Sequence, residues 1–139
     1  MIMTGEERKA LALEYIKRLD RGDDFFALFD EHAEVYFPKW GVAQGRDQIC
    51  QLFADVGAVL AAIKHHYAYF NYIGEGDTLV VEGTSEGQTA SGAQWRAGVG
   101  HGGRWCDVFE IRNGLIQRLY IYTDPDYWGA DTSRYPWLS

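Results

Sequence analysis

The segment RWCDVFEIRNGLIQRLYIY, residues 104–122, decides the fold of this chain. Apolar and polar residues alternate through its first half, which predicts a strand from Arg104 to Arg112. A second strand is predicted from Leu115 to Tyr122. Asn113-Gly114 between them is the preferred sequence of a two-residue type I′ turn, so we expect the two strands to form a hairpin.

Asp107 interrupts the apolar face of this hairpin. Period-two geometry places it on the same face as Trp105, Phe109 and Ile111. A buried unpaired charge is costly, so such a carboxyl group is paired, protonated or part of a functional site. Pairing with a nearby arginine, or a register that turns Asp107 to solvent, is the structural alternative to a functional role.

Helical periodicity predicts three helices in the first half of the chain, over Glu6–Arg21, over Phe25–Phe29, and from Gly45 along an apolar stripe to Ile63. Thr4 and Glu7 have the spacing of a capping box at the start of the first helix, and Gly22 is expected to end that helix.

Further strands are expected over Ala33–Phe37, His65–Ile73 and Thr78–Gln88, with a glycine-rich connection over Thr89–Gly103. Helices followed by mostly antiparallel strands predict an α+β fold. We expect a cone-shaped, curved antiparallel or mixed sheet packed on three N-terminal helices, with a ligand cavity inside the cone. One domain is expected over residues 1–139, with the aromatic tail 125–139 packed on its body.

Composition excludes several kinds of partner. The 139 residues carry a formal net charge of −7, which argues against binding nucleic acid or an anionic membrane. Cys50 and Cys106 lack the spacing of a metal site, and we expect neither a disulfide nor a metal or organic cofactor. The N-terminus shows no apolar signal segment, so the cytoplasm is the expected compartment.

The order of several short motifs resembles the nuclear-transport-factor-2-like (NTF2-like) superfamily, in its SnoaL-like, polyketide-cyclase-like branch. These motifs are Gly-Asp after the first helix, Ala-Leu-Phe, Gly-Arg-Asp-x-Ile, and the Asp-Val-Phe-Glu-Ile-Arg-Asn-Gly-Leu-Ile hairpin. The resemblance covers residues 6–124. It implies the cone-shaped fold and pairing of two copies through the outer face of the sheet, where Arg118, Tyr120 and Tyr122 are expected.

Ketosteroid isomerases of this superfamily use a helix tyrosine and a protonated strand aspartic acid as oxyanion donors, plus a second aspartate as base. By resemblance Tyr15 and Asp107 occupy the positions of the two donors, whereas Phe37 stands at the position of the base. In the resemblance to limonene epoxide hydrolase, Glu86 lies near the position of an acid. His101, in a flexible glycine-rich stretch, is a further acid–base candidate.

Side chains expected to form the ligand wall come from several predicted elements; they are Tyr36, Phe37, Trp40, Phe53, Thr84, Trp105, Phe109, Leu119 and Ile121. The adjacent His65 and His66 point to opposite sides of an extended chain, and we expect both at the surface.

Three functions remain open from the sequence. The first is an acid–base enzyme, of isomerase, cyclase or hydrolase type, acting on an apolar and carbonyl-bearing or cyclic molecule. Asp107 would either donate to an oxyanion together with Tyr15 or, if ionised, act as the base. The second is a binding module for an apolar metabolite. The third is a structural or interaction domain whose pocket is filled by its own aromatic residues or by the tail from Trp128 to Trp137.

Overall fold

The computed structural model describes residues 2–99, 102–123 and 127. Its elements along the chain are α1 (Gly5–Arg21), the 3₁₀ turn η1 (Phe26–Leu28), β1 (Phe29–Phe37), β2 (Gly41–Gln44), α2 (Gly45–Ala58), β3 (Leu60–His65), the 3₁₀ turn η2 (Tyr67–Tyr69), β4 (Asn71–Glu75), β5 (Thr78–Thr89), β6 (Gln94–Arg96), β7 (Arg104–Arg112) and β8 (Leu115–Thr123).

The hairpin predicted from residues 104–122 is confirmed as β7 and β8. Asn113 and Gly114 both have positive φ, 56° and 73°, as a type I′ turn requires. Burial alternates along β7, and Trp105, Asp107 and Phe109 all face the inside of the fold. The outward register considered for Asp107 is therefore wrong.

The predicted limits of the first helix are also confirmed. Thr4 accepts a hydrogen bond from the Glu7 backbone and the Glu7 side chain bonds back to Thr4, which completes the capping box. Gly22 ends the helix in the left-handed conformation, with φ of 72°.

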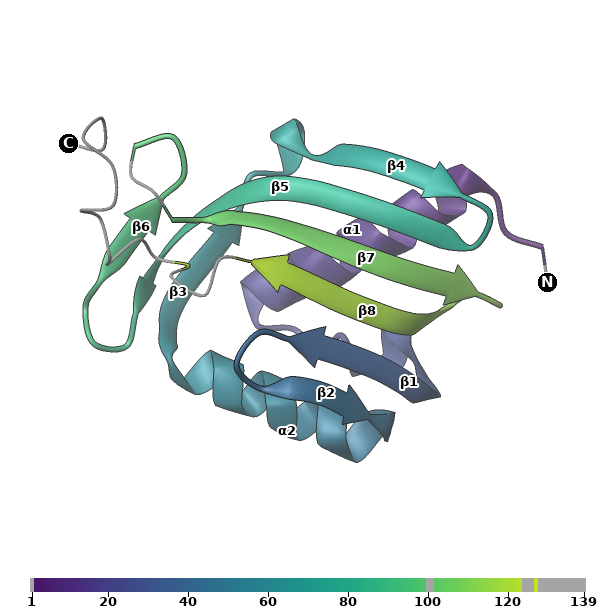
Figure 1. Cartoon of the computed structure of the whole chain (residues 1–139), viewed down its shortest axis with the longest axis horizontal. Coiled ribbons are helices and arrows are strands. Elements are labelled where there is room, and N and C mark those ends of the chain that lie inside the picture. Colours follow the sequence, from purple (N-terminus) through teal and green to yellow (C-terminus); the bar gives the residue numbers. More distant parts are fainter. Residues whose placement is uncertain (1, 100–101, 124–126, 128–139) are drawn as a thin grey trace.

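A single curved sheet runs in the order β2-β1-β8-β7-β5-β3, and β4 and β6 also pair with β5. The pairing is antiparallel except between β1 and β8, so the sheet is mixed. In Figure 1, α1 lies behind β7 and β8, and α2 crosses the end of the sheet beside β1 and β2. The expected α+β class is thus confirmed, with two α-helices and a 3₁₀ turn in place of three helices.

The third predicted helix was too long. It ends at Ala58, and Leu60–His65 is a strand that pairs with β5. Leu60 and Ile63 are partly buried, and their spacing of three residues continues the helical stripe. In the strand, a register shift between Leu60 and Ala62 interrupts the regular alternation. Pairing with a strand that follows in the sequence decides the outcome, which local periodicity could not predict.

Other boundaries differ for similar reasons. The strand predicted over His65–Ile73 is divided by η2, and β2 and β6 were not predicted. β6 lies in the glycine-rich connection, where it pairs with β5.

One apolar core joins both helices to the inner face of the sheet, and its most deeply buried large side chains include Tyr15, Phe29 and Phe109.

Candidate functional site

A cavity of about 340 Å³ lies between the two helices and the inner face of the sheet. Its lining is mainly apolar. The polar lining side chains are Tyr15, Lys39, His65, Asp107, Thr123 and Tyr127. The cavity borders Asp107 directly, and the aromatic residues that the structure describes do not fill it.

Asp107 lies in the cavity wall with 6% of its surface exposed. It makes no hydrogen bond to any residue that the structure describes. Burial without a compensating partner raises the pKa of this carboxyl well above its usual range. A protonated Asp107 can donate a hydrogen bond into the cavity, so the geometry favours the donor role over the base role left open by the sequence.

Tyr15 reaches the same cavity from α1. Its ring packs edge-on against four phenylalanines at centroid distances of 5.4 to 6.3 Å, namely Phe25, Phe29, Phe53 and Phe109. Burial, and secondly the charge of Asp107, raise the pKa of the Tyr15 hydroxyl. This hydroxyl also lacks a hydrogen-bond partner within the described part of the chain. Tyr15 and Asp107 therefore line one cavity with raised pKa values, and each can donate a hydrogen bond into it when it carries its proton.

His65 is the functional candidate that the sequence analysis missed, because it was expected at the surface. It is 8% exposed and lines the cavity. Its Nδ1 lies 2.6 Å from Oδ1 of Asp20, and its backbone N–H donates to Oδ2 of Asp20 at 2.8 Å. The Tyr67 hydroxyl donates to the same Oδ2 at 2.6 Å. The His65 side chain is thus held by a carboxylate, as catalytic imidazoles commonly are.

Asp20 remains the charged partner in this arrangement. Burial opposes its ionisation, but the hydrogen bonds and charge of His65, with the bond from Tyr67, hold the pKa of Asp20 below its usual range. When the His65 ring is neutral, its hydrogen bond to the Asp20 carboxylate favours the proton on Nδ1 and leaves the lone pair on Nε2. No hydrogen bond to Nε2 comes from the residues described.

His65 and Asp107 are close on the inner surface. The His65 ring lies edge-on to Trp105 at a centroid distance of 5.2 Å. Trp105 is two residues from Asp107 on β7, so their side chains occupy consecutive inward positions. A base and two acids can therefore act on one small molecule in the cavity.

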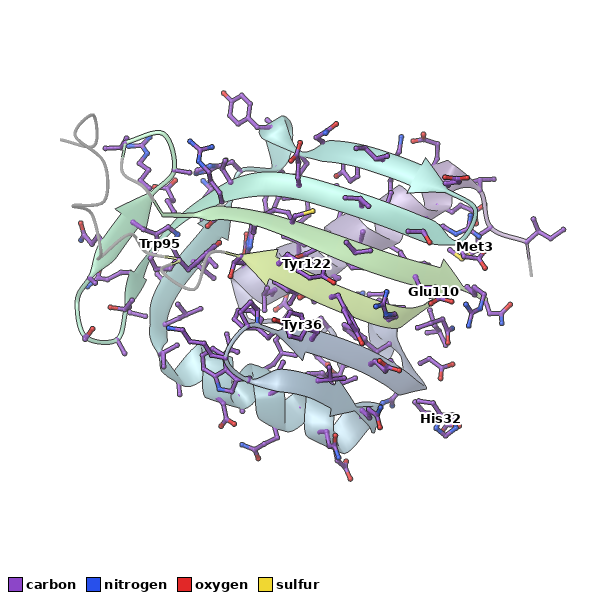
Figure 2. The ribbon with its side chains drawn as sticks, in the orientation of Figure 1. Met3, His32, Tyr36, Trp95, Glu110 and Tyr122 are labelled. Carbon is purple, nitrogen blue, oxygen red and sulfur yellow. The ribbon has the colours of Figure 1, made fainter. Side chains whose placement is uncertain are left out.

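Five predicted ligand-wall residues do line the cavity: Phe37, Trp40, Phe53, Trp105 and Ile121. Phe109 and Leu119 do not, because they are fully buried in the core beneath it. Tyr36 lies on the outer face of the sheet, in the group of side chains turned toward the viewer in Figure 2, against Tyr120 and Tyr122.

Glu86 and Thr84 also lie outside the cavity. Alternation along β5 turns them outward, where Nδ1 of His66 lies 2.8 Å from Oγ1 of Thr84 and Nε2 lies 3.3 Å from Oε1 of Glu86. The predicted catalytic role for Glu86 and the ligand contact for Thr84 are not supported by this placement. His101 lies outside the described residues, and so does the tail predicted to pack on the body, residues 125–139, except for Tyr127.

Two further observations concern ligands and membranes. In residues 2–99, 102–123 and 127, no three His, Cys, Asp or Glu side chains are grouped as a metal site would need. None of the helices in that part of the chain has the length and hydropathy needed to cross a membrane.

The curved mixed sheet closed by two helices around an apolar cavity is the NTF2-like fold. A family model described as a SnoaL-like domain matches residues 12–119, which is most of the chain. The chain therefore belongs to the SnoaL-like domain family. The resemblance stated from the sequence is confirmed.

Solved structures share the fold at low sequence identity. A candidate polyketide cyclase from Xanthomonas campestris pv. campestris is 15% identical with a TM-score of 0.74, and the match covers 88% of this chain and 94% of that one. An NTF2-like protein of unknown function from Burkholderia pseudomallei is 17% identical with a TM-score of 0.73, covering 88% and 92%. TerC, crystallised with polyporic acid, is 20% identical with a TM-score of 0.65, covering 85% and 92%. No curated protein matches the chain.

Proposed function

We propose that this protein is an acid–base enzyme of the isomerase or cyclase class that acts on a small, mainly apolar carbonyl compound in the cavity. The observation that carries this proposal is the buried His65, hydrogen-bonded to Asp20 and lining the same cavity as Asp107 and Tyr15. His65 supplies the base that is missing at Phe37. The similarity to a candidate polyketide cyclase supports the reaction class.

The reaction begins when Nε2 of His65 takes a proton from the carbon next to the carbonyl group. The electron pair of that C–H bond forms the enolate, whose oxygen accepts hydrogen bonds from the neutral Asp107 and Tyr15. The imidazolium formed is stabilised by the Asp20 carboxylate. In an isomerase, His65 returns the proton to a different carbon. In a cyclase, the enolate carbon bonds to a second carbonyl carbon, the π electrons of that carbonyl group move to its oxygen, and the resulting alkoxide takes the proton from the His65 imidazolium.

Enolisation of 2-tetralone, a small bicyclic ketone, tests this function directly. Exchange of its α-hydrogens for deuterium is followed by proton NMR in buffered D₂O. We expect the protein to accelerate exchange and His65→Gln to reduce the acceleration by roughly 10² to 10⁴-fold, the usual contribution of a general base. His66→Gln, on the outer face, is the matched control and keeps full activity. Equal exchange by wild type and His65→Gln would contradict the proposal.

A binding module for an apolar metabolite is the second candidate, and the mainly apolar lining, with Phe37 in it, favours it. Calorimetric titration with 2-tetralone separates the two. Binding without any acceleration of exchange supports the binding module, whereas exchange that depends on His65 supports the enzyme.

We also propose that two copies of the chain pair through the outer face of β1 and β8. Three tyrosine rings pack there at tilted angles with centroids 5.5 to 6.5 Å apart, those of Tyr36, Tyr120 and Tyr122. Tyr36 and Tyr122 are labelled in Figure 2. Tyr122 is 49% exposed. The Arg118 guanidinium lies 3.6 Å from the Tyr120 ring centroid. Aromatic side chains and arginine are the residues that interfaces favour. Light scattering should give a dimer for wild type and a monomer for Tyr122→Glu.

A further inference from the structure

We propose that Tyr127 is a specificity-determining residue of the cavity: its ring forms the wall beside His65 and limits the bulk that a ligand can carry next to its oxygen atom. The inference rests on the proposed acid–base function, since it places the ligand oxygen at Asp107 and Tyr15. Tyr127 lines the cavity together with all three of these residues.

Tyr127 is anchored through both its side chain and its backbone. Its hydroxyl lies 2.5 Å from Oγ of Ser85, and its carbonyl oxygen accepts a hydrogen bond from the Gly103 N–H at 2.7 Å. The ring also packs on Trp95, with centroids 5.6 Å apart. Nε1 of Trp95 donates to the same Ser85 oxygen at 3.1 Å. These contacts fix the ring as a wall.

Ser85, Trp95 and the glycines Gly87 and Gly103 form a platform on which Tyr127 packs. Trp95, a β6 residue labelled in Figure 2, fills the space that the two glycines leave. Ser85 and Trp95 are both buried, with 0% and 5% of their surface exposed. A Cβ atom at Gly87 would collide with the Trp95 ring and with the Ala62 carbonyl oxygen, and one at Gly103 would lie 2.8 Å from Cδ1 of Trp95. Only glycine leaves room for the indole at these two positions.

The register of β3 and β5 places this platform next to the proposed base. Ser85 is the direct partner of His65, so their side chains are neighbours on one face of the sheet. Burial raises the pKa of the Tyr127 hydroxyl, the hydrogen bond with Ser85 lowers it by less, and negative charge at Asp107 and Asp20 raises it further. The hydroxyl therefore keeps its proton and can donate it to Ser85, while Ser85 donates to the Gly103 carbonyl at 3.4 Å.

The other end of the cavity is different. β3 starts at Leu60, directly after α2, and ends at His65. Leu60 lines the cavity with Val56 and Val59, so that end is aliphatic. If the ligand oxygen lies at Asp107 and the carbon beside it lies at His65, a group attached to that carbon would meet Tyr127, because Tyr127 bonds to Ser85, the strand partner of His65. A group attached far from the oxygen would lie along the aliphatic end.

Two series of phenols test this arrangement, because a phenol oxygen can accept hydrogen bonds as an enolate does. The 2-alkylphenols carry bulk next to the oxygen, and the 4-alkylphenols carry it at the far side; each series runs from methyl to butyl. By calorimetry we expect wild type to lose affinity along the 2-alkyl series only. Tyr127→Ala should bind 2-butylphenol about tenfold more tightly than wild type, since the alkyl group gains apolar contacts there.

Tyr127→Phe is the matched control because it keeps the ring and removes the hydroxyl, and it should retain the wild-type preference. Tyr127→Leu provides a second test if the alanine variant unfolds, which thermal denaturation will show. The inference is overturned if removal of the ring leaves the preference unchanged, if Tyr127→Phe relaxes it equally, or if no phenol binds any of the proteins. Failure of the acid–base function would appear separately, as 2-tetralone exchange that does not depend on His65.

Discussion

The two buried aspartates of the cavity region have opposite surroundings. Asp20, at the end of α1, accepts hydrogen bonds from His65 and Tyr67, and its pKa lies below the usual range. Asp107, on β7, has no hydrogen-bond partner among the residues described, and burial raises its pKa. One residue type thus provides a fixed negative charge at one place and a neutral acid at the other. The hydrogen bonds around each carboxyl group, more than burial itself, decide its charge.

Of the substitutions that test this comparison, removal of the Asp20 carboxylate should have the largest effect on stability and activity. Asp20→Ala leaves the imidazole and backbone N–H of His65 and the Tyr67 hydroxyl without their acceptor. We expect the free energy of unfolding to fall by about 3 kcal/mol and 2-tetralone exchange to be nearly lost. Urea denaturation measures the first. Asp23→Ala, which removes an exposed ion pair with Arg21, is the control and should cost under about 1 kcal/mol. Equal effects of the two substitutions would show that the Asp20 network stabilises nothing.

Asp107→Asn should remove the pH dependence of stability that the buried acid causes. Below about pH 3.9, the ordinary pKa of aspartate, both the folded and unfolded states keep the proton. As the pH rises, the unfolded state ionises first, so wild type loses stability up to the raised pKa of folded Asp107. Asparagine removes this loss. Thermal denaturation should show the variant more stable than wild type at pH 7, with the difference shrinking toward pH 4. A difference independent of pH would mean that Asp107 is not protonated in the fold.

Tyr67→Phe weakens the Asp20 network without removing its charge. The variant loses one hydrogen bond to a carboxylate, so we expect a decrease of about 1.5 kcal/mol in the free energy of unfolding. The pKa of Asp20 should rise because one bond that stabilises its charged form is gone. An NMR titration of the Asp20 carboxyl carbon checks this, and an unchanged titration would assign Tyr67 to packing alone.

The smallest loss of stability is expected when a hydrogen bond to a carboxylate on the outer face, that of Glu34, is removed. The Tyr120 hydroxyl donates to Glu34 at 2.9 Å where solvent can replace it. Tyr120→Phe should therefore lower the free energy of unfolding by about 1 kcal/mol or less. A larger loss would indicate that this face is shielded from water, as in the proposed dimer, and repeating the denaturation at several protein concentrations would reveal that dependence.

Local sequence signals predicted the parts of the fold that depend on neighbouring residues. The capping box at Thr4 and Glu7 and the turn at Asn113-Gly114 need only backbone geometry within a few residues. The inward position of Asp107 followed from alternation along a single strand. The end of α2 could not be predicted, because Leu60 to His65 becomes a strand only by pairing with β5.

The residues of the candidate site also differ in whether the sequence alone could indicate them. Asp107 was found from the alternation along its strand, and Tyr15 from the resemblance to ketosteroid isomerases. His65 was missed because its partner Asp20 is 45 residues away in the chain, and no local pattern links the two. Glu86 was misplaced for a related reason: its strand alternates clearly, but which side faces the cavity depends on the neighbouring strands.

The sequence by itself determined the main hairpin and an acidic residue on an apolar face, since these depend on short-range periodicity and turn chemistry, and the order of its motifs carried the resemblance to the SnoaL-like family. Only the tertiary structure decided that Asp107 has no hydrogen-bond partner among the residues described and a raised pKa, that Asp20 is paired with His65 and has a lowered pKa, and that His65 lies with Asp107 at one cavity. The physical reason is that burial and hydrogen-bond partners set the charge of a carboxyl group, and both are supplied by distant parts of the chain.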